Sequence, residues 1–188
     1  MRSWHGPWVF DRRFARTATM KGASSSTKPE LRLKRLMKGR PGRRLALAES
    51  CTGGLIAARV TSISGSSDYF DRGFVVYSND AKADMLGVDP ALLERFGAVS
   101  RETALALLDG LFARSGAFYG AAVTGIAGPG GGSKEKPVGT VYIAWGTRSS
   151  RLLELLNLSG SRHAIRKAAA DRVLTELCRL VENGDGEP

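Results

Sequence analysis

Residues 44–61, RLALAESCTGGLIAARVT, decide the fold class of this chain. Residues 44–48 are a short apolar run, which is typical of a buried strand, and the two glycines in residues 50–54 indicate a turn. Residues 55–61 then continue as a helix. A buried strand that passes through a tight turn into a helix is the recurring unit of α/β proteins, so this segment predicts an α/β fold.

The rest of the chain continues this alternation of strands and helices. Further strands are predicted at residues 73–78, 119–125, 140–145 and 152–158. Further helices are predicted from residue 30 to the Gly39–Pro41 region, at residues 79–86, from the cap Ser100 to Gly116, and at residues 162–182 after the cap Ser161. The last two strands follow each other directly, so we expect them to pair antiparallel. The pattern predicts an α/β sandwich with a mixed sheet.

Composition limits the class of protein further. The chain has 188 residues, enough for one domain and a tail, and its 43% hydrophobic content is ordinary for a soluble protein. Residues 116–133, which belong to the longest uncharged stretch, are rich in glycine, so we expect no membrane span. The two cysteines, Cys51 and Cys178, cannot form a disulfide framework, which favours a reducing, cytoplasmic location. The scarcity of Cys and His also argues against a structural metal, and His163 is the one histidine considered for catalysis.

The net charge of +10 is concentrated at the N-terminus. Residues 1–44 hold 13 Lys and Arg against 2 Asp and Glu, whereas residues 45–188 hold 15 against 16. We therefore expect residues 1–30 to be a basic, disordered extension and residues 31–184 to be a single domain. A start of translation at Met20 and an organelle targeting peptide are the alternatives. Nucleic acid is expected to bind at most weakly, through this tail.

The turn after the first strand offers a candidate nucleophile. Ser50 lies where a strand ends and a helix begins, so free helix-start amides could stabilise an oxyanion beside it. Gly53 and Gly54 would let a ligand approach the backbone. The alternative, which the pattern alone favours, is that Ser50 or Thr52 only caps the helix. Cys51 is a second possible nucleophile, but we interpret it as a small buried residue.

Two further segments carry candidate site residues. Lys82 follows the second strand near the start of a helix, and a neutral lysine there could deprotonate a serine, with Tyr77 relaying or orienting the proton. The alternative is a surface lysine. The glycine-rich loop after Thr124 could cradle a phosphate through its amides, or it could be a flexible connector. Arg162 and Arg166, one turn apart at a helix start, could bind the same anion or form a solvated face.

Taken together, these segments resemble one known family. They are LALAESCTGG (45–54), FVVYSNDAK (74–82), GAVS (97–100), VTGIAGPGGGSKEKPVGTVYIA (123–144) and SRHAIR (161–166). In order and spacing they are similar to the CinA C-terminal domain family over about residues 31–182. The stand-alone enzymes of that family are nicotinamide mononucleotide (NMN) deamidases.

The resemblance implies a CinA C-terminal-like fold, a three-layer α/β/α sandwich with a mixed sheet, and an amidohydrolase that converts NMN and water to nicotinate mononucleotide and ammonia. It implies no cofactor and no metal, and homodimers are common in the family. Ser50 would be the nucleophile, Lys82 its base and Tyr77 a relay or orienting group. The implied substrate-binding residues are Cys51, Thr52, Gly53, Asn79, Thr124, Gly125, Gly128, Gly130, Gly131 and Arg162.

The sequence departs from the family pattern at two places. It lacks the molybdopterin-binding-like N-terminal domain of full-length CinA proteins, so the pyrophosphatase activity of that domain is not expected. Ser161 stands where family members often have aspartate before the arginine. The alternative function is a non-catalytic nucleotide-binding module linked to competence or DNA damage. The presence of both Ser50 and Lys82 favours the enzyme.

Overall fold

A computed structural model describes residues 28–184. In this part of the chain, five strands form one mixed sheet in the order β2-β1-β3-β4-β5. They are β1 (Leu45–Glu49), β2 (Phe70–Val75), β3 (Tyr119–Gly125), β4 (Thr140–Thr147) and β5 (Arg151–Asn157). β1 is parallel to β2 and β3, whereas β4 is antiparallel to β3 and β5. The predicted mixed sheet and its antiparallel final pair are confirmed.

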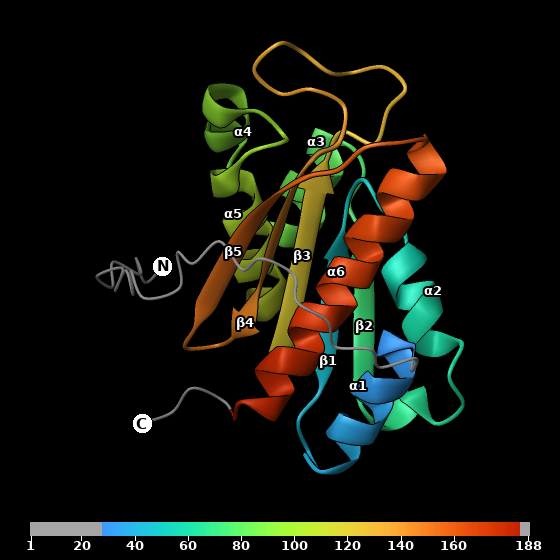
Figure 1. Ribbon diagram of the computed structural model, residues 1–188. Coiled ribbons are helices and arrows are strands. Elements are labelled where there is room, and N and C mark those ends of the chain that lie inside the picture. The colour runs from blue at the N-terminus through green and yellow to red at the C-terminus, as the bar shows by residue number, and fades with distance from the viewer. Residues whose placement is uncertain (1–27, 185–188) are drawn as a thin grey trace, which may run out of the picture.

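Helices cover both faces of the sheet (Figure 1). They are α1 (Pro29–Lys38), α2 (Leu55–Thr61), α3 (Asn79–Leu86), α4 (Pro90–Phe96), α5 (Arg101–Arg114) and α6 (Arg162–Glu182), with a short 3₁₀ turn, η2 (Ser66–Asp68). α1, α2 and α6 lie on one face, and α3, α4 and α5 lie on the other. The predicted three-layer α/β/α sandwich is therefore confirmed.

β1 contributes side chains to the core on both faces of the sheet, because successive side chains of a strand point to opposite faces. Leu45 and Leu47 are buried with residues of α1, α2 and α6. Ala46 and Ala48 are buried with residues of α3, α4 and α5. A strand buried on both faces appears in the sequence as a continuous apolar run, which is why residues 44–48 predicted it.

Several predicted elements differ from the observed ones. Both α4 and η2 were absent from the prediction, although Asp89-Pro90 is a typical helix start and Asp89 does accept a hydrogen bond from the Ala91 amide. β2 begins three residues earlier than predicted and ends at Val75, and α1 begins at Pro29. Ser100 and Ser161 are confirmed as caps. The extension predicted for residues 1–30 lies mostly outside the described residues.

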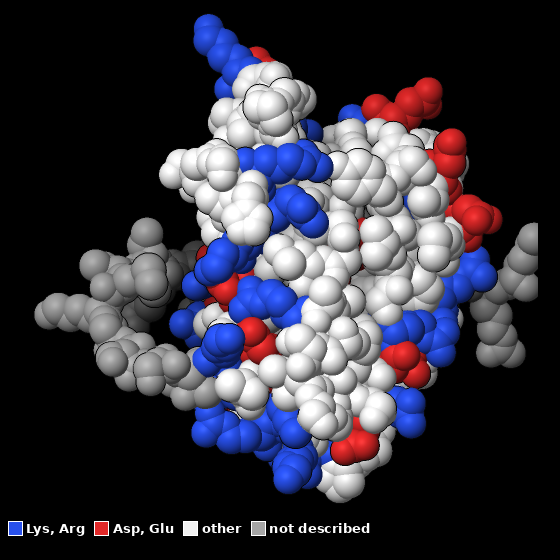
Figure 2. All heavy atoms as spheres, turned by 90° about the vertical axis from the view of Figure 1, so that its right-hand side faces the viewer, with Lys and Arg blue, Asp and Glu red and all other residues white. Residues whose placement is uncertain are grey.

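The charge is unevenly placed on the described surface. Figure 2 shows Lys and Arg gathered at the lower end of the molecule, where α1 lies in Figure 1. α1 contributes Lys34, Arg35 and Lys38 to this end. The loop between β3 and β4 lies at the opposite end of the molecule (Figure 1). Within residues 28–184, no helix combines the length and apolar character that crossing a membrane requires.

Candidate functional site

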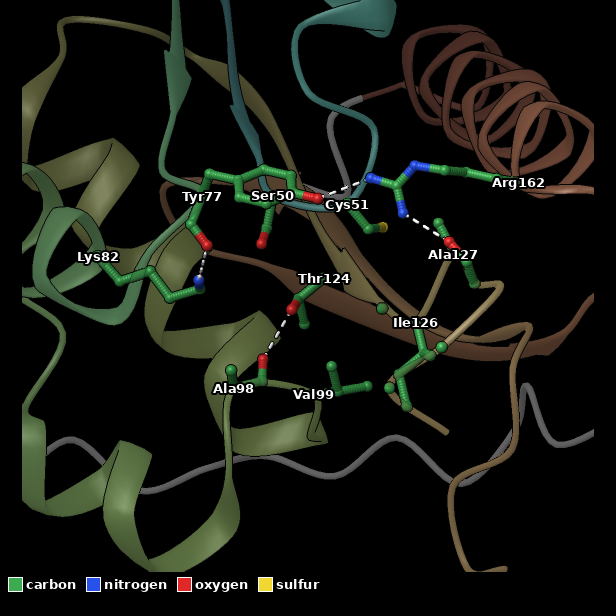
Figure 3. A pocket seen from close by; sticks show the side chains of 14 residues that line it. Ser50, Cys51, Tyr77, Lys82, Ala98, Val99, Thr124, Ile126, Ala127 and Arg162 are labelled. Atoms are coloured by element: carbon green, nitrogen blue, oxygen red, sulfur yellow. Dashed lines mark hydrogen bonds between the residues drawn. The ribbon is translucent and has the colours of Figure 1, made fainter. Parts of the chain in front are cut away.

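A pocket of about 240 Å³ lies at the carboxyl ends of β1, β2 and β3 (Figure 3). These three strands are neighbours and run parallel, so the loops that follow them meet at one edge of the sheet. The N-terminal turn of α6 contributes Arg162 to the same pocket. The structure therefore brings together the three loops and the helix start that the sequence singled out separately.

The predicted site residues line this pocket, with the exception of Thr52, Gly53 and Asn79. Their contact with a ligand stays a prediction, since these three residues lie beside the pocket lining and not in it. Thr52 is fully buried within the turn, and Gly53 takes a left-handed conformation (φ 58°) on the exposed side of that turn. Asn79 is the exposed first residue of α3.

Of the other residues that line the pocket, sequence reasoning missed Ala98 and Val99, and it included Ile126 and Ala127 only as part of the Thr124–Gly132 loop. Ala98 and Val99 lie between α4 and α5, and Ile126 and Ala127 begin the glycine-rich loop. None of these residues has an acidic, basic or nucleophilic side chain, so a search for reactive groups does not identify them. The available signal was the segment GAVS just before a capped helix, which supported the family resemblance but was assigned no role.

Ser50 follows β1 directly and does not cap α2. The α2 amides of Ile56 and Ala57 donate instead to the carboxylate of Glu49, over 3.1 and 2.8 Å. Gly54 occupies the cap position of α2 without a side-chain bond. The prediction that capping is the favoured role of Ser50 or Thr52 is therefore wrong. The Ser50 hydroxyl has no hydrogen-bond partner among the described residues, so it is available for chemistry.

Glu49 should be important for stability, because the residue is 1% exposed and its carboxylate satisfies two helix-start amides. We expect Glu49→Ala to lower the free energy of unfolding by about 2–4 kcal/mol, since two partly or fully buried donors lose their acceptor. Chemical denaturation would measure this loss. Glu94→Ala, on the exposed face of α4, is the matched control and should be nearly neutral. Equal midpoints for the two variants would contradict the role of Glu49.

Lys82 is a buried amine in the first turns of α3. It is 1% exposed, and its Nζ donates to the backbone carbonyls of Tyr77 and Ser78 over 3.1 and 3.2 Å. It forms no ion pair with any carboxylate of residues 28–184, and burial lowers its pKa. Figure 3 shows Lys82 extending from α3 toward the region where the Ser50 side chain lies. The alternative of a surface lysine is therefore excluded.

Cys51 and His163 are not suited to nucleophilic catalysis here. The Cys51 side chain is buried, and burial raises the pKa of its thiol to about 12, so the thiol is protonated at neutral pH. His163 is exposed on α6 and does not line the pocket. The interpretation of Cys51 as a buried thiol agrees with the structure, although its side chain does reach the pocket wall.

Arg162 connects the second loop to the glycine-rich loop. Its Nη2 donates to the Tyr77 hydroxyl over 2.7 Å, and its Nη1 donates to the Gly128 carbonyl over 2.7 Å (Figure 3). Arg166, one turn later, donates to the Thr52 carbonyl from Nε and Nη2. Arg162 therefore lines the pocket, whereas Arg166 braces the turn that carries Ser50.

The glycine-rich loop presents backbone amides that are open to a ligand. The amides of Ala127, Gly128, Gly130 and Gly131 donate to no described residue. Gly128 has a φ of 76°, and a Cβ added to it would lie 2.6 Å from the Val138 side chain, so both its conformation and its packing require glycine. At Gly130 a Cβ would meet open space, so packing does not require glycine at that position.

Comparison with known proteins decides the family. The family model of the CinA C-terminal domain matches residues 27–181. The chain belongs to the CinA C-terminal domain family. Its pocket is therefore assembled from segments that match the family model along nearly the whole described chain.

Named relatives and solved structures agree with this assignment. A CinA-like protein of Syntrophobacter fumaroxidans is 51% identical over 140 residues, which are 74% of this chain and 33% of the relative. A CinA-like protein of Geotalea daltonii is 52% identical over 138 residues, 73% of this chain and 33% of the relative. The chain thus spans about a third of the length of these curated relatives.

Two solved CinA-family structures have the same fold. The competence/damage inducible protein CihA of Agrobacterium tumefaciens is 47% identical, with a TM-score of 0.78 over 82% of this chain and 96% of that one. The competence damage-inducible protein A of Klebsiella pneumoniae is 31% identical, with a TM-score of 0.79 over 83% and 96% of the two chains. These names refer to competence and damage induction.

Proposed function

We propose that this CinA-family domain is an amidohydrolase that hydrolyses the carboxamide of NMN to nicotinate mononucleotide and ammonia. The observation that carries the proposal is the shared pocket of Ser50 and Lys82, in which a hydroxyl without a partner among residues 28–184 lies with a buried lysine whose pKa is lowered. Acyl transfer needs a nucleophile, a base and donors for an oxyanion, and these two loops supply candidates for all three.

In the proposed reaction, the Ser50 Oγ attacks the carboxamide carbon while Lys82 Nζ accepts the hydroxyl proton. The negative charge then develops on the former carbonyl oxygen. The amides of Cys51 and Thr52 follow the nucleophile directly and donate no hydrogen bond to another described residue, so they are the candidate oxyanion donors. Lys82 returns the proton to the amide nitrogen, and ammonia leaves. Water then hydrolyses the Ser50 ester and releases the acid.

The surroundings of Lys82 are suited to a base. Burial with no carboxylate partner in the described chain disfavours the ammonium form, so a larger fraction of Lys82 is neutral near pH 7 than of a solvated lysine. The Tyr77 and Ser78 carbonyls keep Nζ in place in both protonation states. These contacts hold the amine through neutral acceptors, which do not stabilise its charge as a carboxylate would.

The geometry favours an orienting role for Tyr77 over a proton relay. Its hydroxyl accepts a hydrogen bond from Arg162, whereas Lys82 contacts its backbone carbonyl. Proton relay would require the hydroxyl to bridge Ser50 and Lys82. Tyr77 is also 58% exposed, which suits a residue that covers the ring of a bound substrate.

The 5′-phosphate of NMN is assigned to the glycine-rich loop and Arg162. Unpartnered amides and a guanidinium are the donors that bind phosphate best. We expect Arg162→Ala to raise KM about tenfold and to lower kcat less, because the phosphate is remote from the reacting bond. Lys167→Ala, which removes a charge from the same helix, is the matched control. A KM equal to that of the wild type would remove Arg162 from phosphate binding.

The direct test of the function is ammonia release from NMN by the purified protein with no metal added. Stoichiometric ammonia and nicotinate mononucleotide would support the proposal. Binding of NMN without ammonia release would contradict it and favour the alternative of a non-catalytic nucleotide-binding module. Calorimetric titration with NMN distinguishes that result from a complete absence of binding.

A further inference from the structure

The segment that connects α4 to α5 is held in an unusual way. The carbonyls of residues 96–99 all accept hydrogen bonds from side chains of other segments or of α5. Ser100 and Thr103 donate to Gly97 over 3.1 and 2.8 Å, Thr124 donates to Ala98 over 2.7 Å, and Lys136 donates to Phe96 and Val99 over 3.0 and 2.8 Å. This segment supplies Ala98 and Val99 to the pocket wall.

Lys136 is the member of this set that comes from the opposite wall. It lies at the C-terminal end of the glycine-rich loop, whose residues Gly130 and Gly131 line the pocket. Its own backbone is fixed, because its amide donates to the Ser133 hydroxyl and its carbonyl accepts from the Ser133 amide. One ammonium group therefore links the glycine-rich loop to the α4–α5 connection.

The chemistry of this link is favourable. Hydrogen bonds from a charged donor are stronger than those between neutral groups. Phe96 is the last residue of α4, and a cation near the C-terminus of a helix also interacts favourably with the exposed carbonyls there. Lys134, two residues earlier, is exposed and makes no hydrogen bond or ion pair with residues 28–184. The two lysines thus have the same charge but different contacts.

We propose that Lys136 is a positioning residue that fixes the distance between the glycine-rich loop and the α4–α5 connection, the two walls between which a ligand lies. The kinetic consequence rests on the proposed function, since it is measured with NMN. Lys136 does not line the pocket and contacts no reacting group, so its loss should disturb substrate binding more than the chemical step.

The kinetic experiment compares Lys136→Met, which keeps the length of the side chain, with Lys136→Arg and the matched control Lys134→Met. We expect Lys136→Met to raise KM for NMN about tenfold, because both hydrogen bonds from the ammonium group are lost, and to change kcat less than about threefold. Lys136→Arg should recover most of the KM, since a guanidinium can donate to both carbonyls. Lys134→Met should match the wild type.

A second measurement, amide hydrogen exchange without ligand, does not depend on activity. We expect Lys136→Met to speed exchange in peptides covering residues 97–104 and 133–139, because the amides of Gly97, Ala104, Ser133 and Gly139 donate hydrogen bonds that protect them, and Lys134→Met to leave both unchanged. Should the wild type fail to release ammonia, the proposed function fails, and exchange alone decides the role of Lys136. Exchange or KM values of Lys136→Met equal to those of Lys134→Met would overturn the proposal. If Lys136→Met does not fold, Lys136→Gln replaces it in both measurements.

Discussion

Replacement of Ser50 by alanine is expected to reduce ammonia release from NMN by at least about a thousandfold, to the level of residual binding-assisted catalysis. In the proposed mechanism the hydroxyl oxygen forms the acyl intermediate, and we do not expect the neighbouring thiol to replace it. The Cys51 thiol is protonated, because burial raises its pKa to about 12. A coupled ammonia assay at saturating NMN measures the loss.

Measurements of NMN affinity and of the free energy of unfolding distinguish a loss of chemistry in Ser50→Ala from a loss of structure. The Ser50 hydroxyl has no partner among residues 28–184, so its removal should leave the free energy of unfolding within about 0.5 kcal/mol of the wild type. The affinity for NMN should fall less than about threefold, since the pocket keeps its other groups. Ammonia release that survives in a folded Ser50→Ala protein would refute the serine mechanism.

Replacement of Lys82 by methionine should lower kcat by about a hundredfold to ten-thousandfold, the usual contribution of a general base. In the wild type, kcat/KM should rise with pH, because the neutral amine is the active form. The midpoint of this rise should lie below the ordinary lysine pKa of 10.5, since burial lowers the pKa of Lys82. The pH profile of kcat/KM measures both the direction and the position of this ionisation.

Lys82→Arg tests whether the proton or only the charge matters. Arginine keeps a cation in the pocket but does not lose its proton, so this variant should be as inactive as Lys82→Met. Activity that survives in Lys82→Arg, or a wild-type profile without a rise on the alkaline side, would contradict the role of Lys82 as base. An electrostatic role would then explain its position better.

The fold could be predicted well where local pattern and tertiary packing agree. The buried run at residues 45–48 and the periodic apolar face of α6 predicted their elements because each must bury a continuous surface. α4 was missed because its seven residues present only one fully buried side chain, Leu93, so its apolar periodicity is weak. Its cap and proline, Asp89 and Pro90, were the better signal.

The sequence predicted which residues line the site better than it predicted the hydrogen bonds that these residues form. Ser50, Lys82 and Thr124 were grouped through the family resemblance, and they line one pocket because parallel strands place their following loops at one edge of the sheet. The cap of α2 was assigned wrongly because sequence rules look for Ser, Thr, Asp or Asn at the cap position itself. Glu49 reaches the α2 amides from five residues before that position, through the turn, which no spacing rule describes.

The hydrogen bonds from the α2 amides to the Glu49 carboxylate also have a consequence for protein engineering. Because the start of α2 is held from the strand side of the turn, the side chain at position 50 carries no part of the hydrogen bonding within residues 28–184. We therefore expect the fold to tolerate exchange of this side chain. In the proposed mechanism, a cysteine or threonine at this position would meet the same amides and the same lysine on an unchanged helix start. A single codon change would then exchange the nucleophile without redesign of the fold.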